Sequence, residues 1–293
     1  MVSLLWNSRP DPYRHRKAVS SSPSPSKGDG TPRAEEIIRL LGNTPKAADA
    51  VIKGLRKKGW LERATWGKYL LVPPDQGPDA LGDSNLLALA SRVADPYYIG
   101  FGTAAAHYGL TTQHRNVIVL VSPSKLRSRY VGEARLKIVH QTQRKFFGFE
   151  PVDVLGQKVM MSDREKTAFD CIDYAELAGG VGEAAVILAN ASRRFDWPKT
   201  ATYLDRFASS PLAHRVGWLL DHVKADVPHD VRAHLLDLAV HTRKTWLGPD
   251  PARARAHRAI GFDETWRLFV NVTAEELNGS AGLGQRKTIR KDR

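Results

Sequence analysis

Region 33–74 constrains the fold most, because it places a basic helix directly before a two-stranded turn. Thr44 can cap this helix through its hydroxyl, and Pro45 suits the first helical position, where no backbone hydrogen bond is lost. The helix is expected to run to about Lys58 and to stop at Gly59, and a shorter helix is expected ahead of it.

The basic helix is expected to have two opposite faces, since successive residues turn by about 100°. The apolar residues that share one face are Ala47, Ala48, Val51, Ile52 and Leu55. Lys46, Lys53 and Lys57 fall together on the opposite face, with Arg56 at its edge. One face is therefore expected to pack against the protein, and the other to form a cationic ridge.

The residues that follow Gly59 predict a strand, a tight turn and a second strand that ends near Val72. Helix, helix and hairpin in this order predict a winged helix-turn-helix domain. Such a domain lays the helix before its hairpin in the DNA major groove, which is about 12 Å wide. The candidate DNA-binding residues are Thr44, Lys46, Lys53, Arg56, Lys57, Arg63, Trp66 and Lys68.

Within this set, we expect Lys53, Arg56 and Lys57 to reach the major groove or its flanking phosphates. Lys46 would contact a phosphate near the start of the helix, while Arg63, Trp66 and Lys68 would bring the wing to the DNA backbone or minor groove. Two plainer interpretations remain open: the cations solvate an ordinary helix, and Trp66 packs on the wing.

The distribution of charge favours binding to a polyanion. Residues 34–73 carry eight Lys and Arg against four Asp and Glu, whereas residues 74–285 carry 25 against 24. Both ends are basic as well, and the net charge of the whole chain is +13. The excess positive charge is thus concentrated in the small domain and the two tails.

The length of 293 residues suits two domains, and 42% hydrophobic content is enough for a substantial core. Cys171 is the only cysteine, so we expect no internal disulfide and a reducing, cytoplasmic location, with this thiol buried and inert. No apolar run approaches the length of about 18 to 20 residues that a membrane span needs.

Four segments are expected along the chain: a flexible basic arm over 1–32, a winged-helix domain over 33–74, a larger mixed α+β domain over 80–277, and a basic tail over 278–293. In the larger domain the sequence predicts helices over 86–93, 103–108, 182–195, 199–207, 212–222 and 229–240, with a further helix opened by a capping box at Ser162. Strands are predicted over 116–121, 136–141, 146–154 and 158–161, and extended pieces at 96–99, 245–247 and 265–272.

Several segments imitate catalytic or ligand motifs. Gly100-Phe-Gly102 resembles a dinucleotide fingerprint, but no carboxylate follows about 20 residues later, so close helix packing is the better interpretation. Asp170 and Asp173 are three residues apart and more typical of ion pairs than of acid/base partners. The histidines show no metal-ligand spacing, and we expect no cofactor, no metal and no catalytic residues.

Three stretches in this order resemble the AbiEi-type antitoxins of bacterial abortive-infection toxin–antitoxin pairs. They are the wing that ends in Tyr-Leu-Leu-Val-Pro, the segment from Tyr97 through Gly-Phe-Gly and His107 to Gln113, and the segment from Ser162 to Asp173 with a valine-rich strand before it. The resemblance covers roughly residues 34–275 and omits the serine- and proline-rich arm and the basic tail.

This resemblance implies a non-enzymatic, DNA-binding antitoxin that represses its own operon through the winged helix. It also implies that the second domain neutralises a nucleotidyltransferase-like toxin encoded nearby. Two other classes stay open: a winged-helix transcriptional regulator with no toxin partner, and a nucleotide-binding enzyme. The residues alone point to DNA binding, and the toxin enters only through the resemblance.

Overall fold

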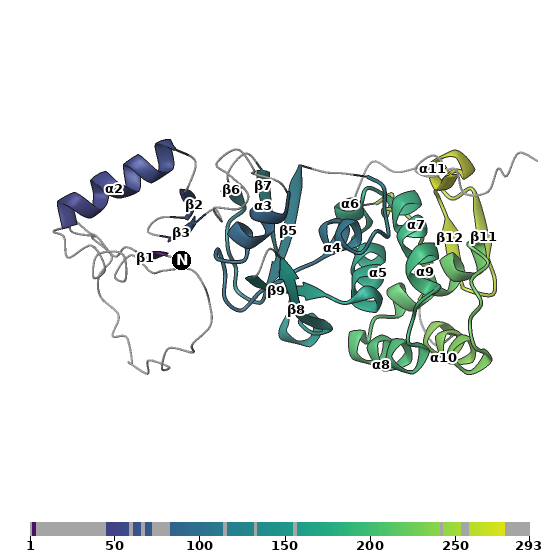
Figure 1. Ribbon diagram of the computed structural model, residues 1–293. Coiled ribbons are helices and arrows are strands. Elements are labelled where there is room, and N and C mark those ends of the chain that lie inside the picture. Colours follow the sequence, from purple (N-terminus) through teal and green to yellow (C-terminus); the bar gives the residue numbers. More distant parts are fainter. Residues whose placement is uncertain are drawn as a thin grey trace, which may run out of the picture. The chain divides into compact units, whose positions relative to one another are not determined.

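The computed structural model describes residues 2–3, 45–58, 61–65, 68–71, 83–113, 116–131, 134–154, 157–240, 243–252 and 258–278. The chain divides into two compact units. The first comprises residues 1–95, 128–136 and 151–159, and the second comprises residues 96–127, 137–150 and 160–293. Both helices and a mixed sheet are present (Figure 1), so the predicted α+β class is confirmed.

The first unit contains the predicted basic helix, α2, over Pro45–Lys57. The antiparallel hairpin of β2 (Leu61–Thr65) and β3 (Lys68–Leu71) follows it, and β1 (Val2–Ser3) pairs with the free edge of β3. A further helix, α3, spans Asp83–Ala90. The helix expected ahead of Thr44, the boundary expected near residue 75 and the tail beyond residue 278 lie outside the described residues.

A six-stranded sheet has the order β6-β7-β5-β4-β9-β8. Its strands are β4 (Tyr98–Ile99), β5 (Val117–Ser122), β6 (Arg129–Val131), β7 (Ala134–His140), β8 (Phe149–Val154) and β9 (Gln157–Ser162). The central strand β4 runs antiparallel to β5 and parallel to β9, which makes the sheet mixed. The sequence predicts all of these strands except β6, which has only three residues and so gives no strand signal.

Most of the helices belong to the second unit. They are α4 (Phe101–His107), α5 (Arg164–Asp173), α6 (Ala175–Ala178), α7 (Val181–Ser192), α8 (Trp197–Phe207), α9 (Ser210–His222), α10 (His229–Val240) and α11 (Ala274–Asn278). α5 packs against α7 and α9, and all three contribute to the apolar core. Among the described residues, no helix is long and apolar enough to span a membrane.

The start of α5 differs from the predicted capping box. Asp163, not Ser162, is the N-cap, and its carboxylate accepts a hydrogen bond from the Lys166 backbone N–H at 2.9 Å. Ser162 instead ends β9, where its hydroxyl lies 2.7 Å from the Thr167 hydroxyl. The box prediction was wrong because the strand continues one residue further than the alternation indicated, and aspartate caps a helix as well as serine does.

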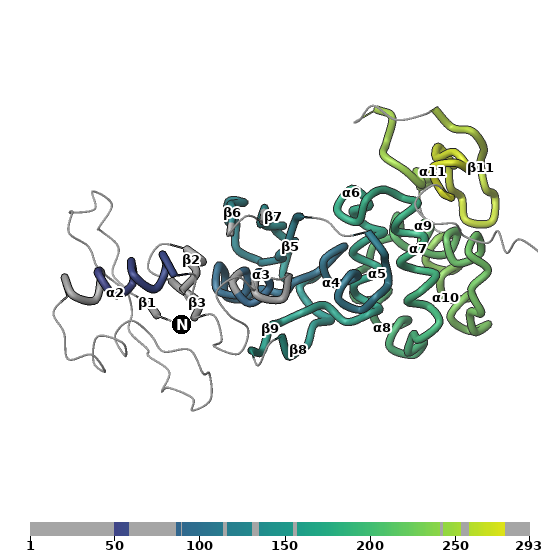
Figure 2. The backbone as a smooth tube through the Cα atoms, turned by 45° about the horizontal axis from the view of Figure 1, so that its top comes forward, coloured from purple at the N-terminus to yellow at the C-terminus, as the bar shows by residue number. Residues whose placement is uncertain are grey.

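A small three-stranded sheet completes the second unit (Figure 2, yellow). β12 (Leu268–Val270) lies between β10 (Thr245–Trp246), which is parallel to it, and β11 (Gly261–Asp263), which is antiparallel to it. The extended piece predicted over 265–272 is therefore shorter, because residues 264–267 form the turn between β11 and β12. Arg267 in this turn has a left-handed backbone, which is rare outside glycine.

Trp266 in this turn packs into a slot on α9 where only a glycine fits. A Cβ added to Gly217 would lie 2.1 Å from the Trp266 ring. The indole N–H donates to the Asp221 carboxylate at 2.7 Å, and the Trp266 carbonyl oxygen contacts the ring Nδ1 of His214. The large side chain is 2% exposed, so the turn is fixed to the helix by burial as well as by hydrogen bonds.

We therefore predict that Gly217→Ala destabilises the protein, because the new methyl group forces the indole out of its slot. The expected loss is about 1–3 kcal/mol in the free energy of unfolding, measured by urea titration. Gly54→Ala on α2 is the matched control, since a Cβ there meets nothing within 4 Å. The control should be neutral or stabilising by up to about 1 kcal/mol. Equal stability of Gly217→Ala and the wild type would contradict this packing.

Candidate functional site

α2 has the apolar, buried face and the cationic, exposed face that the sequence predicts. Ile52 is buried at 3% exposure, and Val51 and Leu55 beside it are half-buried. The side chains of Lys53, Arg56, Lys57 and Lys58 are exposed to solvent. The helix thus packs through its apolar face and presents cations, three of them predicted DNA contacts, on its solvent side.

Small residues lie among the cations of α2. Ala50 is exposed, and Gly54 is exposed with open space where a side chain would be. At about 100° per residue, both lie within a quarter turn of the ridge formed by Lys53 and Lys57. A flat surface such as a sugar-phosphate backbone could therefore approach the helix backbone while the long lysine side chains reach past it on either side.

The hairpin after α2 brings two more predicted contacts into one element. Arg63 pairs with Tyr69, and Lys68 pairs with Thr65, with an irregularity in register between residues 63 and 65. Both cations therefore belong to the end of the hairpin near its turn. Lys46 lies in the first turn of α2. Thr44 and Trp66 lie outside the described residues, so their predicted roles as helix cap and wing contact stay predictions.

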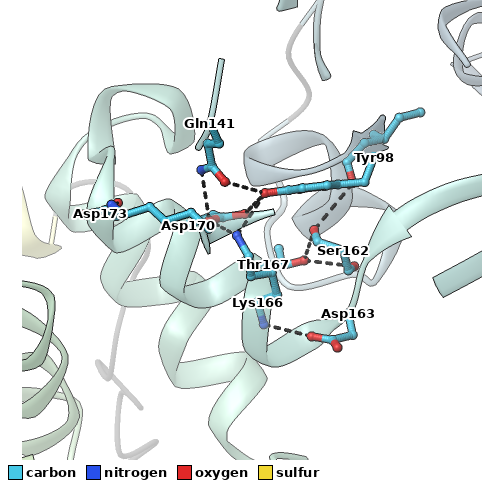
Figure 3. Close-up of polar contacts among 10 residues, drawn as sticks. Tyr98, Gln141, Ser162, Asp163, Lys166, Thr167, Asp170 and Asp173 are labelled. Carbon is cyan, nitrogen blue, oxygen red and sulfur yellow. Dashed lines mark hydrogen bonds and ion pairs between the residues drawn. The ribbon is translucent and has the colours of Figure 1, made fainter. Parts of the chain in front are cut away.

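A second cluster, which we call the buried polar cluster, consists of Tyr98, Gln141, Lys166 and Asp170 in the second unit (Figure 3). Lys166 and Asp170 form an ion pair one helical turn apart on α5, and both side chains are fully buried. The Tyr98 hydroxyl lies 2.9 Å from Asp170 Oδ2 and accepts a hydrogen bond from Lys166 Nζ at 2.9 Å. Gln141 reaches the same hydroxyl at 2.9 Å and donates to Asp170 at 3.4 Å.

Aromatic rings surround the Lys166 ammonium on its remaining side. Its nitrogen lies 4.8 Å from the ring centre of Phe207, 5.1 Å from that of Tyr98 and 5.3 Å from that of Phe147. The negative faces of these rings stabilise a cation that has lost its water. The ammonium is thus held by one carboxylate, one hydroxyl and a cage of π-systems.

Burial opposes ionisation throughout this cluster. It lowers the pKa of Lys166 and raises the pKa of Asp170, and in each case the partner's opposite charge counteracts the effect of burial. The pKa of Tyr98 is well above its ordinary value, first through burial and then through the negative charge of Asp170. Tyr98 therefore keeps its proton and serves as a hydrogen-bonding bridge.

Asp173 forms an ion pair with Lys145, whose ammonium also lies 5.5 Å from the centre of the Tyr174 ring. Asp170 and Asp173 thus each face a lysine, as the ion-pair interpretation of this helix predicts. The Lys145 pair is largely buried as well, with side chains 17% and 10% exposed. These carboxylates stabilise positive charge and are not directed at each other.

A network at the start of α5 connects it to α8. Glu165 accepts hydrogen bonds from the Asp196 backbone N–H at 2.9 Å and from Lys199 Nζ at 2.8 Å. Lys199 also lies 3.0 Å from Asp163, whose carboxylate accepts a bond from the Tyr203 hydroxyl at 2.7 Å. Glu165 stands three residues after Ser162, where it would complete the predicted capping box, and it instead fixes the first turn of α8.

The glycine-rich segments serve packing. A Cβ added to Gly102 would lie 3.2 Å from the carbonyl oxygen of Leu177, so α4 approaches α6 closely, as the packing interpretation predicts. Gly179 and Gly180 have φ angles of 119° and 107° and form the turn from α6 to α7. Cys171 is buried, as predicted.

Lys166, Gln141 and Tyr98 were not predicted to form a unit. The spacing of Lys166 and Asp170 by four residues is visible in the sequence, but this spacing is common on solvated helices. Ala168, Phe169 and Ile172 fall within about 100° of one another on α5, and Lys166 and Asp170 fall on the opposite face, where an amphipathic helix meets solvent. The structure buries that face as well, and no local pattern signals it. Gln141 lies in the loop after β7, and nothing local in the sequence connects it to α5.

No protein-family model and no curated protein matches this chain. The chain is similar in fold to the crystal structure of the RV2827C protein from Mycobacterium tuberculosis, with a TM-score of 0.55 and 16% sequence identity. The match covers 81% of this chain and 83% of that one. At this identity the likeness shows a shared fold and nothing about activity.

We predict that Lys166→Met destabilises the protein by about 3–5 kcal/mol, because it leaves the Asp170 carboxylate buried without its cation. Replacing both partners, with Lys166→Met and Asp170→Leu, should recover part of the loss. Lys158→Met is the control, since Lys158 and Asp153 are 3.8 Å apart and 67% and 56% exposed, a geometry that contributes less than about 1 kcal/mol. Urea unfolding measures all three, and a Lys166→Met loss no larger than that of the control would contradict the role of the pair.

Proposed function

We propose that this protein is a DNA-binding antitoxin that represses its own operon through a winged helix containing α2 and the β2–β3 hairpin. The observation that carries the DNA-binding half is the exposed cationic face of α2 directly before an antiparallel hairpin. A winged helix uses this order of elements, with the helix in the major groove and the hairpin against the backbone.

The dimensions of α2 suit this role. A helix of 13 residues is about 20 Å long, and a single helix with its side chains fills a groove about 12 Å wide. Lys53, Arg56 and Lys57 lie within its second half and would contact base edges or flanking phosphates. Lys46 would contact a phosphate near the start of the helix, and Thr44 would cap it. Arg63, Trp66 and Lys68 would place the wing on the DNA backbone.

The antitoxin half rests on the resemblance to AbiEi-type antitoxins. In this proposal the second unit neutralises a nucleotidyltransferase-like toxin encoded nearby, and no step is catalytic. The segment 162–173 is among the most distinctive parts of the resemblance, and most of its side chains are buried, among them Ser162, Lys166 and Asp170. We therefore assign this segment to the scaffold of the second unit, and we expect any toxin contact to come from other, exposed residues.

The first test concerns DNA. The DNA is a duplex taken from the region upstream of the protein's own gene, which we call the upstream duplex. We predict that Arg56→Ala combined with Lys57→Ala weakens binding to it by at least about tenfold at about 150 mM salt. Each lost phosphate contact should also flatten the dependence of log affinity on log salt by about 0.9. Arg193→Ala with Arg194→Ala removes the same charge from exposed positions after α7 and is the matched control. Fluorescence anisotropy on upstream and shuffled duplexes measures these effects.

A wild-type preference for the upstream duplex of about tenfold, or about 1.4 kcal/mol, would support a specific regulator. Titrations in which the α2 variant and the control agree with the wild type would remove α2 from the DNA interface. Equal, weak binding of the wild type to both duplexes would contradict the repressor half of the proposal.

The second test concerns the toxin. We predict that the neighbouring nucleotidyltransferase-like gene stops growth when it is expressed alone, and that coexpression of this chain restores growth. The Arg56→Ala and Lys57→Ala variant should still restore it, since α2 belongs to the DNA-binding half. Failure of the folded wild-type protein to rescue growth, together with specific DNA binding, would leave a transcriptional regulator with no toxin partner.

A further inference from the structure

A second group of cations lies far from α2 in the sequence. Residues 125–137 carry five Lys and Arg against one Glu, within a long segment whose total charge is close to neutral. They include the hairpin of β6 and β7, which we call the basic ribbon. Within the ribbon Arg129 pairs with Leu136, and Tyr130 pairs with Arg135.

The two faces of the basic ribbon differ in character. Leu136 is fully buried and Ile138 is 9% exposed, so these residues of β7 point into the protein. Arg135 lies on the opposite face and is exposed. Tyr130, directly across from Arg135, is 71% exposed. A tyrosine ring and a guanidinium therefore lie side by side on the solvent face of the ribbon.

Protection of the sheet edge explains only part of this arrangement. β6 is the last strand of the six-stranded sheet, and charged residues on an edge strand prevent pairing with other chains. An exposed tyrosine has the opposite tendency, because aromatic residues favour strand pairing. Edge protection thus leaves the Tyr130 ring unexplained, and an exposed aromatic ring beside a guanidinium is typical of surfaces that contact nucleic acid.

The tip of the basic ribbon, residues 128–136, belongs to the same compact unit as α2. Residues 128–136 are grouped with residues 1–95, and β6 contacts both α3 and β2 within that unit. The cationic helix, the hairpin after it and the tip of the ribbon are thus parts of one unit although about 70 residues separate α2 from β6.

We propose that the basic ribbon is a second contact to duplex DNA, next to the one made by α2. Arg135 binds a phosphate of the backbone, and the Tyr130 ring packs against the adjacent sugar while its hydroxyl donates to a phosphate oxygen. These contacts position the protein on the duplex without reading its sequence. This inference rests on the proposed function and extends its DNA site to residues outside the winged helix.

Binding of four forms of the full chain to upstream and shuffled duplexes, over a range of salt concentrations, tests this inference. They are the wild type, Tyr130→Ala with Arg135→Gln, Arg56→Ala with Lys57→Ala, and the charge control Arg194→Gln. The ribbon variant, Tyr130→Ala with Arg135→Gln, should bind both duplexes about tenfold more weakly. The slope of log affinity against log salt should be less steep by about 0.9, as expected for the loss of one phosphate contact. Its preference for the upstream duplex should stay unchanged, since the contact is to the backbone. An unchanged melting temperature should accompany these results, because both replaced side chains are exposed.

A ribbon variant that binds like the wild type while the α2 variant is weakened would overturn the inference and leave the proposed function intact. Loss of toxin rescue without loss of DNA binding would overturn it too, because the ribbon would then face a protein partner. If the wild type shows no preference for the upstream duplex, the proposed function fails, but the ribbon contact can still be tested on the shuffled duplex. A weaker salt dependence of the ribbon variant than of the wild type supports the contact, and an equal salt dependence excludes it. Tyr130→Phe with Arg135→Gln separates the ring from the hydroxyl. Binding as weak as that of Tyr130→Ala with Arg135→Gln would assign the contact to the hydroxyl and overturn the packing of the ring against the sugar.

Discussion

Lys166 and Asp170 place opposite charges where water is excluded, and the second unit is arranged around the need to keep both satisfied. Their partners come from separate parts of the chain: Tyr98 from β4, Gln141 from the loop after β7, and Phe207 from the end of α8. A buried charge without its partners costs several kcal/mol, so these segments have to assemble together. This interaction thus helps to join the sheet to the helices, and a partly formed structure cannot satisfy it.

In the first unit charged side chains of α2 are exposed, in contrast to the buried ion pair of the second unit. The cations of α2 are exposed to water, where they contribute little to stability and attract polyanions over a distance set by salt. The Gly54 backbone between them is open to close approach. If α2 reads the sequence of the DNA and the basic ribbon binds backbone phosphates, then sequence reading and positioning are separate functions of one unit. This division would let binding strength change without a change in the preferred sequence.

The sequence predicts elements well where the pattern is local and long. α10 was predicted with its observed ends, and α8 and α9 to within two residues, because each has regular apolar spacing between clear breaks. β6 and β11 were missed, because strands of three residues depend on pairing that no local pattern encodes. The burial of Lys166 and the Trp266 slot over Gly217 were missed for the same reason: each depends on residues more than 40 positions away. The cationic face of α2 was predicted because a helix fixes its own faces.

Site-directed cleavage of DNA tests most directly the claim that α2 lies in the groove of the upstream duplex. Cys171 is buried, so Gly54→Cys gives one accessible thiol at a position where a side chain meets nothing, and an iron chelate attached there cleaves DNA within its short reach. We predict strong cleavage limited to a few base pairs within the upstream duplex and none in the shuffled one, with no cleavage from the same chelate at Arg193→Cys. Weak or evenly distributed cleavage from position 54 would show that α2 does not lie in the groove.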